Sequence, residues 1–493
     1  MSILGNLEPK SVFRFFEEIS QIPHGSGNTK KISDYLVEFA KERNLFYIQD
    51  EVNNVIIIKE ATEGYEEEPA IIIQGHMDMV AVKTESAAID MEKDPLQLQV
   101  EGDFVFAKDT SLGGDDGIAV AYGLAVLADQ DIKHPRLEVI FTVDEETGMD
   151  GAREIDLSML QGKQLLNIDS EEEGFLLTSC AGGARINTEL SFTREEQEGT
   201  IVELSIHGLQ GGHSGVEIHK ERANASHVLA RVLYQTYKEY PFYLCHMEGG
   251  LKDNAIPLEA KAQIMVDTEI AGEISDCFAR KMNKIKEELV IKDPKATVTC
   301  SCQLEGKDNE LTKENVLSKE NVLSKEDTLK AISFVMLQPD GVQNYSANIE
   351  GLVETSLNLG IMEMTEENLS LNFAVRSSVQ SAKDFTVEKV ALMATMLGGT
   401  YEVSSDYPAW EYKQDSSLRD KLVKIYHEMY GEDMVLQAVH AGLECGLLSQ
   451  KIEGLDCVSF GPNMQNIHTT DEKLSIESTK RVWEYIVKVL ETK

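Results

Sequence analysis

Five segments of the sequence carry carboxylates and imidazoles that could bind metal ions or transfer protons. They are His76-Met77-Asp78, Asp115-Asp116, Glu145-Glu146, Asp169 and His468. Carboxylates that share a cleft repel one another unless protons or cations neutralise them. Two imidazoles among them favour a borderline ion such as zinc, because calcium and magnesium prefer oxygen ligands alone. Two histidines and three carboxylates can serve two four-coordinate ions if one carboxylate bridges, and such a pair can activate a shared water.

Each of these segments also has an ordinary structural interpretation. A histidine two residues before an aspartate usually marks the end of a strand, and adjacent acids such as Glu145 and Glu146 commonly form a solvated turn. Asp115 could be no more than the N-cap of a helix that follows it. The metal interpretation gains weight because the segments come after apolar stretches, where an unpaired acid would be costly.

Apolar runs that alternate with helical patterns place these segments in a fold. Strands are predicted at 55–58, 70–73, 137–143, 164–168 and 455–460, and a helix rich in small apolar residues at 117–128. This alternation favours an α/β fold with a mostly parallel sheet flanked by helices. In open α/β sheets, ligands gather beyond the carboxyl ends of the strands, so the segments that follow the strands are expected to converge.

The pattern changes after about residue 185, where half-exposed strands and helices become segregated, and it returns to α/β near residue 406. We therefore predict a catalytic domain formed by residues 1–185 and 406–493, interrupted by a large α+β domain at 186–405. Within the insertion the hexapeptide ENVLSK occurs twice in tandem, at 314–319 and 320–325. Its polar spacing predicts a surface helix or loop.

Composition limits the classes of function. The formal net charge of the 493 residues is −39, and such a surface repels nucleic acid and anionic membranes. No run approaches the roughly 20 apolar residues that span a bilayer. The seven cysteines are scattered and odd in number, which argues against a disulfide framework, and the amino terminus lacks a secretory signal. A cytoplasmic protein is expected.

Several segments together resemble the aminoacyl-histidine dipeptidases, also called Xaa-His dipeptidases or peptidase D. This family belongs to the zinc metallopeptidase clan that includes carnosinases, acylases and tripeptidases. The segments include GHMDMV (75–80), LGGDDGIAVA (112–121), FTVDEETGMDGA (141–152), GLQGGHSGVEIH (208–219) and GPNMQNIHTTDEKLSIEST (461–479). The resemblance covers essentially the whole chain in the same order. It implies hydrolysis of dipeptides, with a preference for carboxy-terminal histidine.

The resemblance also implies two divalent ions for each chain, with zinc as the first choice and cobalt or manganese as substitutes. The implied metal ligands are His76, Asp115, Glu146, Asp169 and His468. Asp115 would bridge the two ions beside a cis peptide bond, with His76 and Asp169 on one ion and Glu146 and His468 on the other.

Two further residues receive catalytic roles from the resemblance. Asp78 would hydrogen-bond the second ring nitrogen of His76 and fix its tautomer. Glu145 would be the general base that takes a proton from the metal-bridging water and returns it to the leaving amine. Glu146 differs from its neighbour because coordination keeps it ionised.

The inserted domain would act as a lid that carries part of the substrate site. By resemblance, His213 would stabilise the oxyanion, and Asn254 and Arg376 would hold the backbone or carboxylate of a small peptide. Glu444 would line the pocket from the catalytic domain. The lid could also form a homodimer interface.

Three other interpretations stay open at the level of the sequence. A related tripeptidase or N-acyl-amino-acid amidohydrolase would share the ligands and differ only in the lid and pocket. A non-catalytic, metal-dependent peptide-binding protein would keep the ligands but is expected to lose the base, whereas Glu145 is present. A calcium-buffering acidic protein fits poorly with His76 and His468 and would need an EF-hand pattern.

Overall fold

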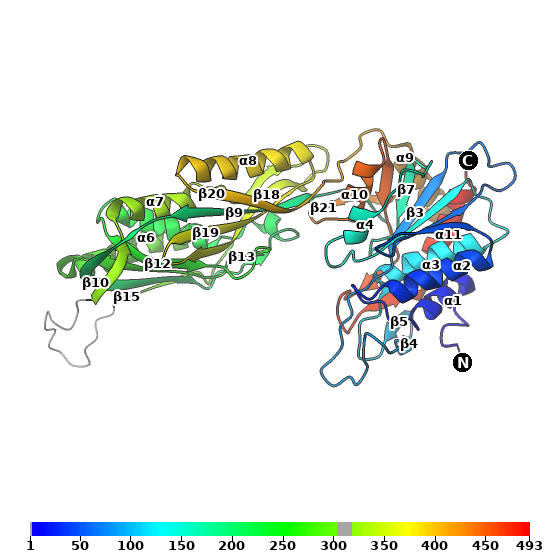
Figure 1. Ribbon diagram of the computed structural model, residues 1–493, viewed down its shortest axis with the longest axis horizontal. Helices are drawn as coiled ribbons and strands as arrows, with labels where there is room; N and C mark the ends of the chain where they lie inside the picture. The colour runs from blue at the N-terminus through cyan, green and yellow to red at the C-terminus, as the bar shows by residue number, and fades with distance from the viewer. Residues whose placement is uncertain (1, 303–317) are drawn as a thin grey trace. The chain divides into compact units, whose positions relative to one another are not determined.

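The computed structural model describes residues 2–302 and 318–493. The chain forms two compact units, each of which is coloured along its length in Figure 1. Unit 1 comprises Met1–Cys180, Trp410–Val439 and Leu443–Lys493, and unit 2 comprises Ala181–Ala409 and His440–Gly442. These bounds lie a few residues from the predicted domain limits, and the short segment His440–Gly442 of unit 2 has no counterpart in the prediction.

Unit 1 contains an eight-stranded sheet in the order β1-β2-β6-β3-β7-β22-β8-β21. The central strands β6, β3, β7 and β22 are parallel to one another. They are almost entirely buried and carry mainly apolar side chains, as expected for parallel strands covered on both faces. The bounds are β1 (Phe46–Gln49), β2 (Val55–Lys59), β3 (Ile71–His76), β6 (Leu137–Thr142), β7 (Gln164–Asn167), β8 (Phe175–Cys180), β21 (Val435–Val439) and β22 (Asp456–Ser459).

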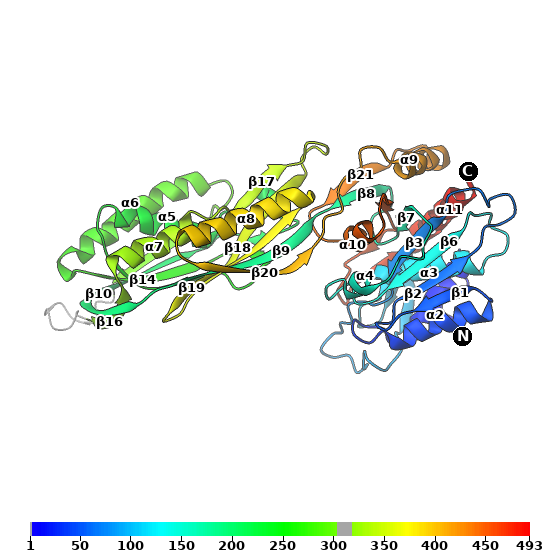
Figure 2. The same ribbon diagram turned by 45° about the horizontal axis from the view of Figure 1, so that its top comes forward.

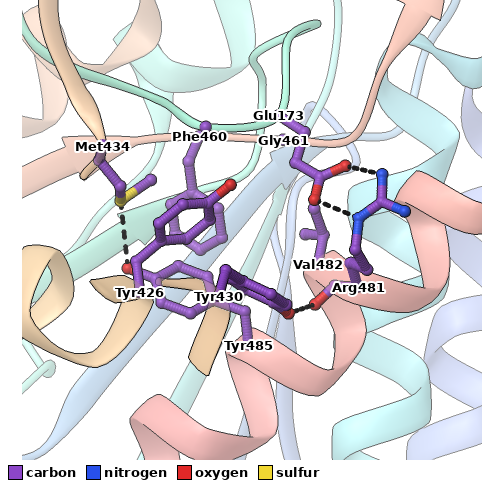
Figure 3. Close-up of a pocket in the computed structure, with 10 residues that line it drawn as sticks. Glu173, Tyr426, Tyr430, Met434, Phe460, Gly461, Arg481, Val482 and Tyr485 are labelled. Carbon is purple, nitrogen blue, oxygen red and sulfur yellow. Dashed lines mark hydrogen bonds and ion pairs between the residues drawn. The ribbon is translucent and has the colours of Figure 1, made fainter. Parts of the chain in front are cut away.

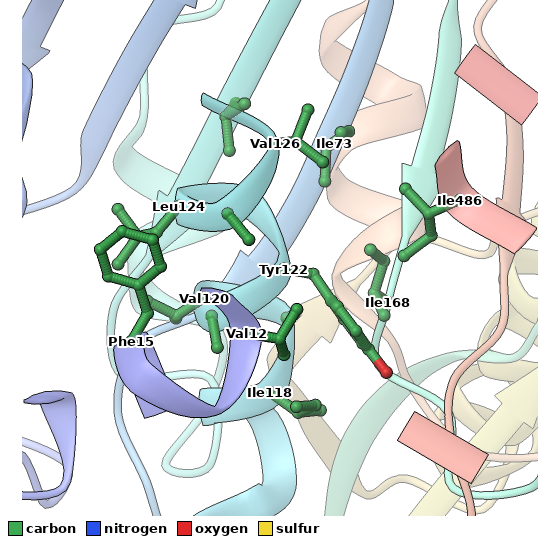
Figure 4. Close-up of a cluster of buried hydrophobic side chains, with 14 of the residues drawn as sticks. Val12, Phe15, Ile73, Ile118, Val120, Tyr122, Leu124, Val126, Ile168 and Ile486 are labelled. Carbon is green, nitrogen blue, oxygen red and sulfur yellow. The ribbon is translucent and has the colours of Figure 1, made fainter. Parts of the chain in front are cut away.

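Helices pack on this sheet through one large apolar core, part of which is shown in Figure 4. In that view Phe15 of α1 lies near Leu124 on one side of α3, and Tyr122 of α3 lies toward Ile486 of α11 on the other side. The central helix α3 is apolar on all sides and therefore almost wholly buried. The helices are α1 (Lys10–Ile19), α2 (Lys30–Glu42), α3 (Gly114–Ala128), α4 (Asp150–Glu154), α9 (Ser417–Tyr430), α10 (Glu444–Lys451) and α11 (Ile476–Glu491).

A small four-stranded sheet in unit 1 has the order β23-β24-β5-β4. It joins the segment that contains His468 to a hairpin much earlier in the chain, because β24 pairs with β5. The bounds are β4 (Leu98–Glu101), β5 (Phe104–Ala107), β23 (Met464–Gln465) and β24 (Lys473–Ser475).

Unit 2 is built on a ten-stranded sheet whose pairings are antiparallel. The main path runs β15-β10-β14-β12-β18-β19-β9-β20, with β16 beside β10 and β17 beside β18. The strands are β9 (Gly182–Ser191), β10 (Arg194–His207), β12 (Tyr243–Gly249), β14 (Ala260–Val266), β15 (Thr297–Cys302), β16 (Ser318–Leu323), β17 (Gly341–Tyr345), β18 (Val353–Met364), β19 (Asn368–Ser377) and β20 (Thr400–Tyr407).

Four helices of unit 2 cover one face of its sheet, as Figure 2 shows, and share a second apolar core with it. They are α5 (Ala225–Tyr237), α6 (Ala271–Leu289), α7 (Lys325–Met336) and α8 (Gln380–Met396). A separate two-stranded pair joins β11 (Gly212–His213) to β13 (Ala255–Ile256), and short 3-10 helices occupy Ile218–Lys220 and Thr268–Ile270.

The predicted fold class is confirmed: a mostly parallel α/β unit is interrupted by a large α+β unit. The prediction of a polar helix or loop at the ENVLSK repeat is wrong where the structure describes it. There, Ser318–Leu323 is the strand β16, paired with Arg194–Gly199 of β10, and Val322 and Leu323 are fully buried. Residues 303–317, which hold most of the first copy, lie outside the described residues. Among the described helices, none combines the length and apolarity needed to cross a membrane.

Candidate metal centre

Three of the predicted segments follow neighbouring parallel strands of unit 1. His76 is the last residue of β3, Glu145 and Glu146 come shortly after β6, and Asp169 comes shortly after β7. Because β3 pairs in parallel with both β6 and β7, the three strands end at one edge of the sheet. The three parallel strands thus place these polar side chains at the same edge of the sheet.

Asp115 at the start of α3 lies between the two histidines of the site. Its Oδ1 is 3.2 Å from His76 Nε2, and its Oδ2 is 3.0 Å from His468 Nε2. His468 Nε2 is also 2.9 Å from Glu146 Oε1, and His76 Nε2 is 3.6 Å from Asp169 Oδ1. All five residues that the sequence singled out as metal ligands therefore lie together around one carboxylate.

Three groups of side chains have potential ligand atoms within 4.8 Å of one another. They are His76 with Asp116 and Asp169, His76 with Glu145 and Glu146, and Asp115 with Glu146 and His468. Asp116, which follows a cis peptide bond, accepts a hydrogen bond from the main-chain N–H of His76 through Oδ2. Its Oδ1 is buried with no hydrogen-bond partner among the described residues. A mixed imidazole and carboxylate set with an unpartnered buried oxygen fits bound divalent cations such as zinc.

Burial and mutual repulsion shape the electrostatics of the cluster. Burial raises the pKa of Asp169 to about 6, with repulsion from Asp115 and Glu146 adding to it. Burial also raises the pKa of Glu145 well above its ordinary value. Hydrogen bonds to Asp115 and then Glu146 raise the pKa of His468 to about 10. The carboxylates outnumber the imidazoles, so the site attracts additional positive charge.

Asp78 connects His76 to the segment after β6. Nδ1 of His76 lies 3.0 Å from the main-chain oxygen of Asp78 and 3.5 Å from its carboxylate Oδ1. The same carboxylate accepts hydrogen bonds from the main-chain N–H of Glu145 at 3.1 Å and from Ser26 Oγ at 2.8 Å. Through one aspartate, the ring of His76 and the backbone of Glu145 are held together.

Glu444 lies at the start of α10, completely buried within unit 1. Its Oε2 accepts hydrogen bonds from Gln74 Nε2 at 2.5 Å and Thr142 Oγ1 at 2.7 Å. Burial raises its pKa to about 7, whereas the nearby imidazole of His76 lowers it. The structure therefore places Glu444 beneath the carboxylate cluster, in the interior of unit 1.

The other three predicted substrate residues belong to unit 2 and lie close to one another. Asn254 accepts a hydrogen bond from Ser214, the residue after His213, through its main-chain oxygen at 2.9 Å. A Cβ atom on Gly215 would lie 3.0 Å from His213 Cε1 and 3.2 Å from Arg376 Nε. The glycine thus permits the imidazole and the guanidinium to approach each other.

The charge of Arg376 acts on the nearby ring of His213. His213 Nδ1 accepts hydrogen bonds from the main-chain N–H groups of Gly215 and Val216, so the neutral ring carries its proton on Nε2. Burial and then the charge of Arg376 lower the pKa of His213. Arg376 donates to Tyr407 at 3.2 Å, and its Nε is buried without a partner. In the described part of the chain no carboxylate forms an ion pair with Arg376, which leaves its charge available to an anion.

The sequence reasoning missed three residues that support these groups. Ser26 donates a hydrogen bond to Asp78 from the turn at residues 24–27 (HGSG), where the sequence offers only a polar residue between two glycines. His440 is buried with its Nε2 2.7 Å from Ser356 Oγ, and it is the first residue of the segment HAGLECG (440–446) that also contains Glu444. Glu472 follows His468 by four residues, and its carboxylate is buried. Each of the three acts on a residue that is distant in the sequence, and such a contact leaves no pattern in the sequence.

The site lies at one edge of a mostly parallel sheet, where histidines and carboxylates follow the strand ends. A comparison with known protein families identifies the family to which the chain belongs. Residues 72–492 match peptidase family M20/M25/M40. The chain belongs to this family and is a hydrolase that acts on peptide bonds. The resemblance seen in the sequence is thereby confirmed at the level of the family.

Known relatives extend over the whole chain. It is 34% identical over 492 residues to the cytosol non-specific dipeptidase of Escherichia coli (strain K12), with 99% of each chain covered. The crystal structure of aminoacylhistidine dipeptidase from Vibrio alginolyticus superposes with a TM-score of 0.92 and 34% identity, covering 99% of this chain and 97% of that one. A tripeptidase from Staphylococcus aureus, 15% identical with a TM-score of 0.55 and 98% of each chain covered, shares the fold.

Proposed function

We propose that this protein is a cytoplasmic dipeptidase that uses two divalent cations, zinc in the first instance, to hydrolyse dipeptides with a preference for carboxy-terminal histidine. The observation that carries the proposal is the position of Asp115, with one carboxylate oxygen beside each of two imidazoles. The names of the two relatives at 34% identity support a dipeptide substrate, and one of them is named as cytosolic.

Five side chains are proposed to hold the two cations. His76 and Asp169 would bind one, Glu146 and His468 the other, and Asp115 both. When bound, the cations supply positive charge that acidifies water and stabilises negative charge on the substrate oxygen. Asp78 would keep the ring of His76 in one orientation.

Glu145 is proposed as the general base. Its carboxylate would accept a proton from the attacking water and donate it to the leaving nitrogen. The hydrogen bond from its main-chain N–H to Asp78 supports this role, because it fixes the backbone of the base relative to the ring of His76. Because the side chain of Glu444 is fully buried, we propose that it affects substrate binding only indirectly, through the residues that it contacts.

Unit 2 is proposed to act as the lid and to supply groups that hold the peptide. The Nε2–H of His213 would donate a hydrogen bond to the oxyanion, and Arg376 would bind the terminal carboxylate as a fork. Asn254 would hold the peptide backbone. The unpaired charge of Arg376 supports an anionic partner. We also propose that unit 2 forms a homodimer interface.

The experiment combines metal analysis of the purified protein with a panel of Xaa-His dipeptides, other dipeptides, tripeptides and N-acyl amino acids. Two metal ions per chain and fastest turnover of Xaa-His dipeptides are expected. Glu145→Ala should keep both ions and lose turnover about 10²- to 10⁴-fold, whereas Glu154→Ala, an exposed acid further along the same segment, should match the wild type. Faster hydrolysis of tripeptides or acyl amino acids, or full activity of Glu145→Ala, would contradict the proposal.

A further inference from the structure

We propose that Glu472 is a positioning residue that fixes Asp115 between His76 and His468 and thereby sets the affinity of the site for its cations. The inference rests on the proposed two-cation function. It concerns a side chain that binds neither cation nor substrate and that acts through the backbone of another residue.

The carboxylate of Glu472 receives a converging set of main-chain hydrogen bonds. Its Oε2 accepts from the N–H of Leu112 at 2.7 Å and of Gly113 at 3.1 Å. Its Oε1 accepts from the N–H of Gly114 at 2.8 Å and of Asp115 at 3.4 Å. The side chain is 97% buried, since only 3% of its surface is exposed. One carboxylate thus collects four successive N–H groups that end at Asp115.

These donors lie in and just before the first residues of α3, where the backbone at Asp115 and Asp116 is not yet helical, so their N–H groups have no partner within the helix. A local side chain normally caps such donors, but the N-cap position here is Gly113, which has none. Glu472 provides the cap from 358 residues away in the sequence, counted from Gly114.

Glycine is favoured where the carboxylate approaches the chain. Gly113 has a φ of +69°, in the left-handed region that favours glycine. A Cβ atom on Gly114 would lie 3.2 Å from Oε1 of Glu472, closer than an ordinary contact. The two glycines of the GGDD segment therefore allow its backbone to approach the carboxylate of Glu472 closely.

The position of Glu472 links two segments that carry proposed ligands. His468 lies in the connection between β23 and β24, and Glu472 immediately precedes β24. That strand is held in place by its pairing with β23 and β5. When Glu472 binds the start of α3, it therefore ties the backbone of Asp115 to the loop of His468. The 3.0 Å separation between Asp115 Oδ2 and His468 Nε2 depends on this tie.

The test is a titration of the metal-free full-length protein with Co²⁺, followed by the visible absorption of the bound ion. Glu472→Gln preserves the size of the side chain but turns an NH₂ group toward main-chain donors. We expect it to weaken binding of at least one Co²⁺ by about 10- to 100-fold, the usual effect of a residue that supports metal ligands. Glu472→Asp keeps the charge, and its Co²⁺ affinity is expected to fall between those of Glu472→Gln and the wild type.

Glu138→Gln is the matched control. Glu138 is a fully buried glutamate whose carboxylate accepts hydrogen bonds from the main-chain N–H groups of Gln161 and Gly162, and it is the second residue of β6, at the end opposite the site. It should lower the melting temperature as Glu472→Gln does, yet bind Co²⁺ like the wild type. Wild-type affinity in Glu472→Gln, or an equal loss in Glu138→Gln, overturns the inference. If Glu472→Gln does not fold, unchanged Co²⁺ binding by Glu472→Asp overturns it. A wild-type protein that binds no Co²⁺ would instead contradict the proposed function.

Discussion

The ring of His213 offers two different nitrogens to its surroundings, and the two can be tested separately. Nδ1 accepts main-chain hydrogen bonds from Gly215 and Val216, so Nε2 is the donor. His213→Asn can keep an acceptor near the position of Nδ1 but loses the donor at Nε2, whereas His213→Gln can keep a donor there. We expect His213→Asn to lower kcat about 100-fold with little change in KM, and His213→Gln to lose less. Steady-state kinetics with one dipeptide measures both, and equal kcat values for the two variants would contradict the assignment.

We expect His440 to make the stability of unit 2 depend on pH. Burial, and then the charge of Arg376, lower its pKa to about 3. Because the folded pKa lies below the unfolded value of about 6.5, its contribution is complete above pH 6.5 and is lost as pH falls toward 3. At pH 5 the loss is about 2 kcal/mol.

The matched variant is His440→Gln, which can still bond Ser356 but does not titrate. On going from pH 7 to pH 5 the wild type should lose roughly 4–8 °C of melting temperature relative to this variant. Calorimetry at the two pH values measures the difference. If the gap between the two proteins is the same at both, His440 is not the titrating group.

The residues that sequence reasoning could find are those that follow strands. His76, Glu146 and Asp169 were predicted to converge because parallel strands end at one edge of a sheet, and the structure brings them together. Their metal-binding roles stay predictions. Ser26 and Glu472 could not be found in this way, because each acts on a partner that is close only after folding.

At the scale of elements, the loop after β7 is anchored by an ion pair to α11. Arg481 forms a two-pronged pair with Glu173, with both N–O distances at 2.6 Å, beside a group of tyrosines (Figure 3). The main-chain N–H of Glu173 also bonds Asn463 Oδ1, and Met464 N–H bonds the oxygen of Glu171. The loop that carries Asp169 is therefore tied both to α11 and to the segment before His468.

We expect Arg481→Lys to loosen this loop, because lysine cannot form the fork. Loss of about 1 kcal/mol should speed amide hydrogen exchange at 171–174 about fivefold. Exchange in β10, in unit 2, serves as the internal reference and should not change. Exchange followed by mass spectrometry of peptides measures this, and unaltered rates at 171–174 would show that the backbone bonds alone hold the loop.

Strands were predicted well where they are apolar and buried, and poorly where pairing creates them. The short apolar runs at 137–143 and 164–168 form β6 and β7, because a central strand of a covered sheet buries such residues on both faces. The ENVLSK segment has the polar composition of a helix or loop, yet Ser318–Leu323 is a strand. Its partner is the first part of β10, and strand preference depends strongly on such neighbours. No local pattern could reveal a partner more than a hundred residues away.

At the scale of the whole molecule, unit 2 exposes the edge of its sheet next to apolar side chains. β20 is the edge strand of its sheet, and its residues from Thr400 to Asp406 are exposed. The neighbouring helix α8 exposes Phe385, Leu392 and Met396, which are 65%, 60% and 77% accessible. An open edge beside apolar side chains favours association, and a twofold pairing of two such edges would cover both.

The net charge of −39 opposes association of two copies, so salt should favour the dimer. We expect light scattering at about 0.15 M salt to give the mass of a dimer for the wild type, and a larger monomer fraction at low salt. Leu392→Glu should yield monomers, because it places charge in the apolar patch. Leu251→Glu changes a leucine of unit 2 that is 94% exposed on another element and should leave the dimer intact. A wild type that is monomeric at high salt, or a dimer that survives Leu392→Glu, would rule out this face as the interface. The exposure of β20 beside three apolar side chains of α8 would then need another explanation.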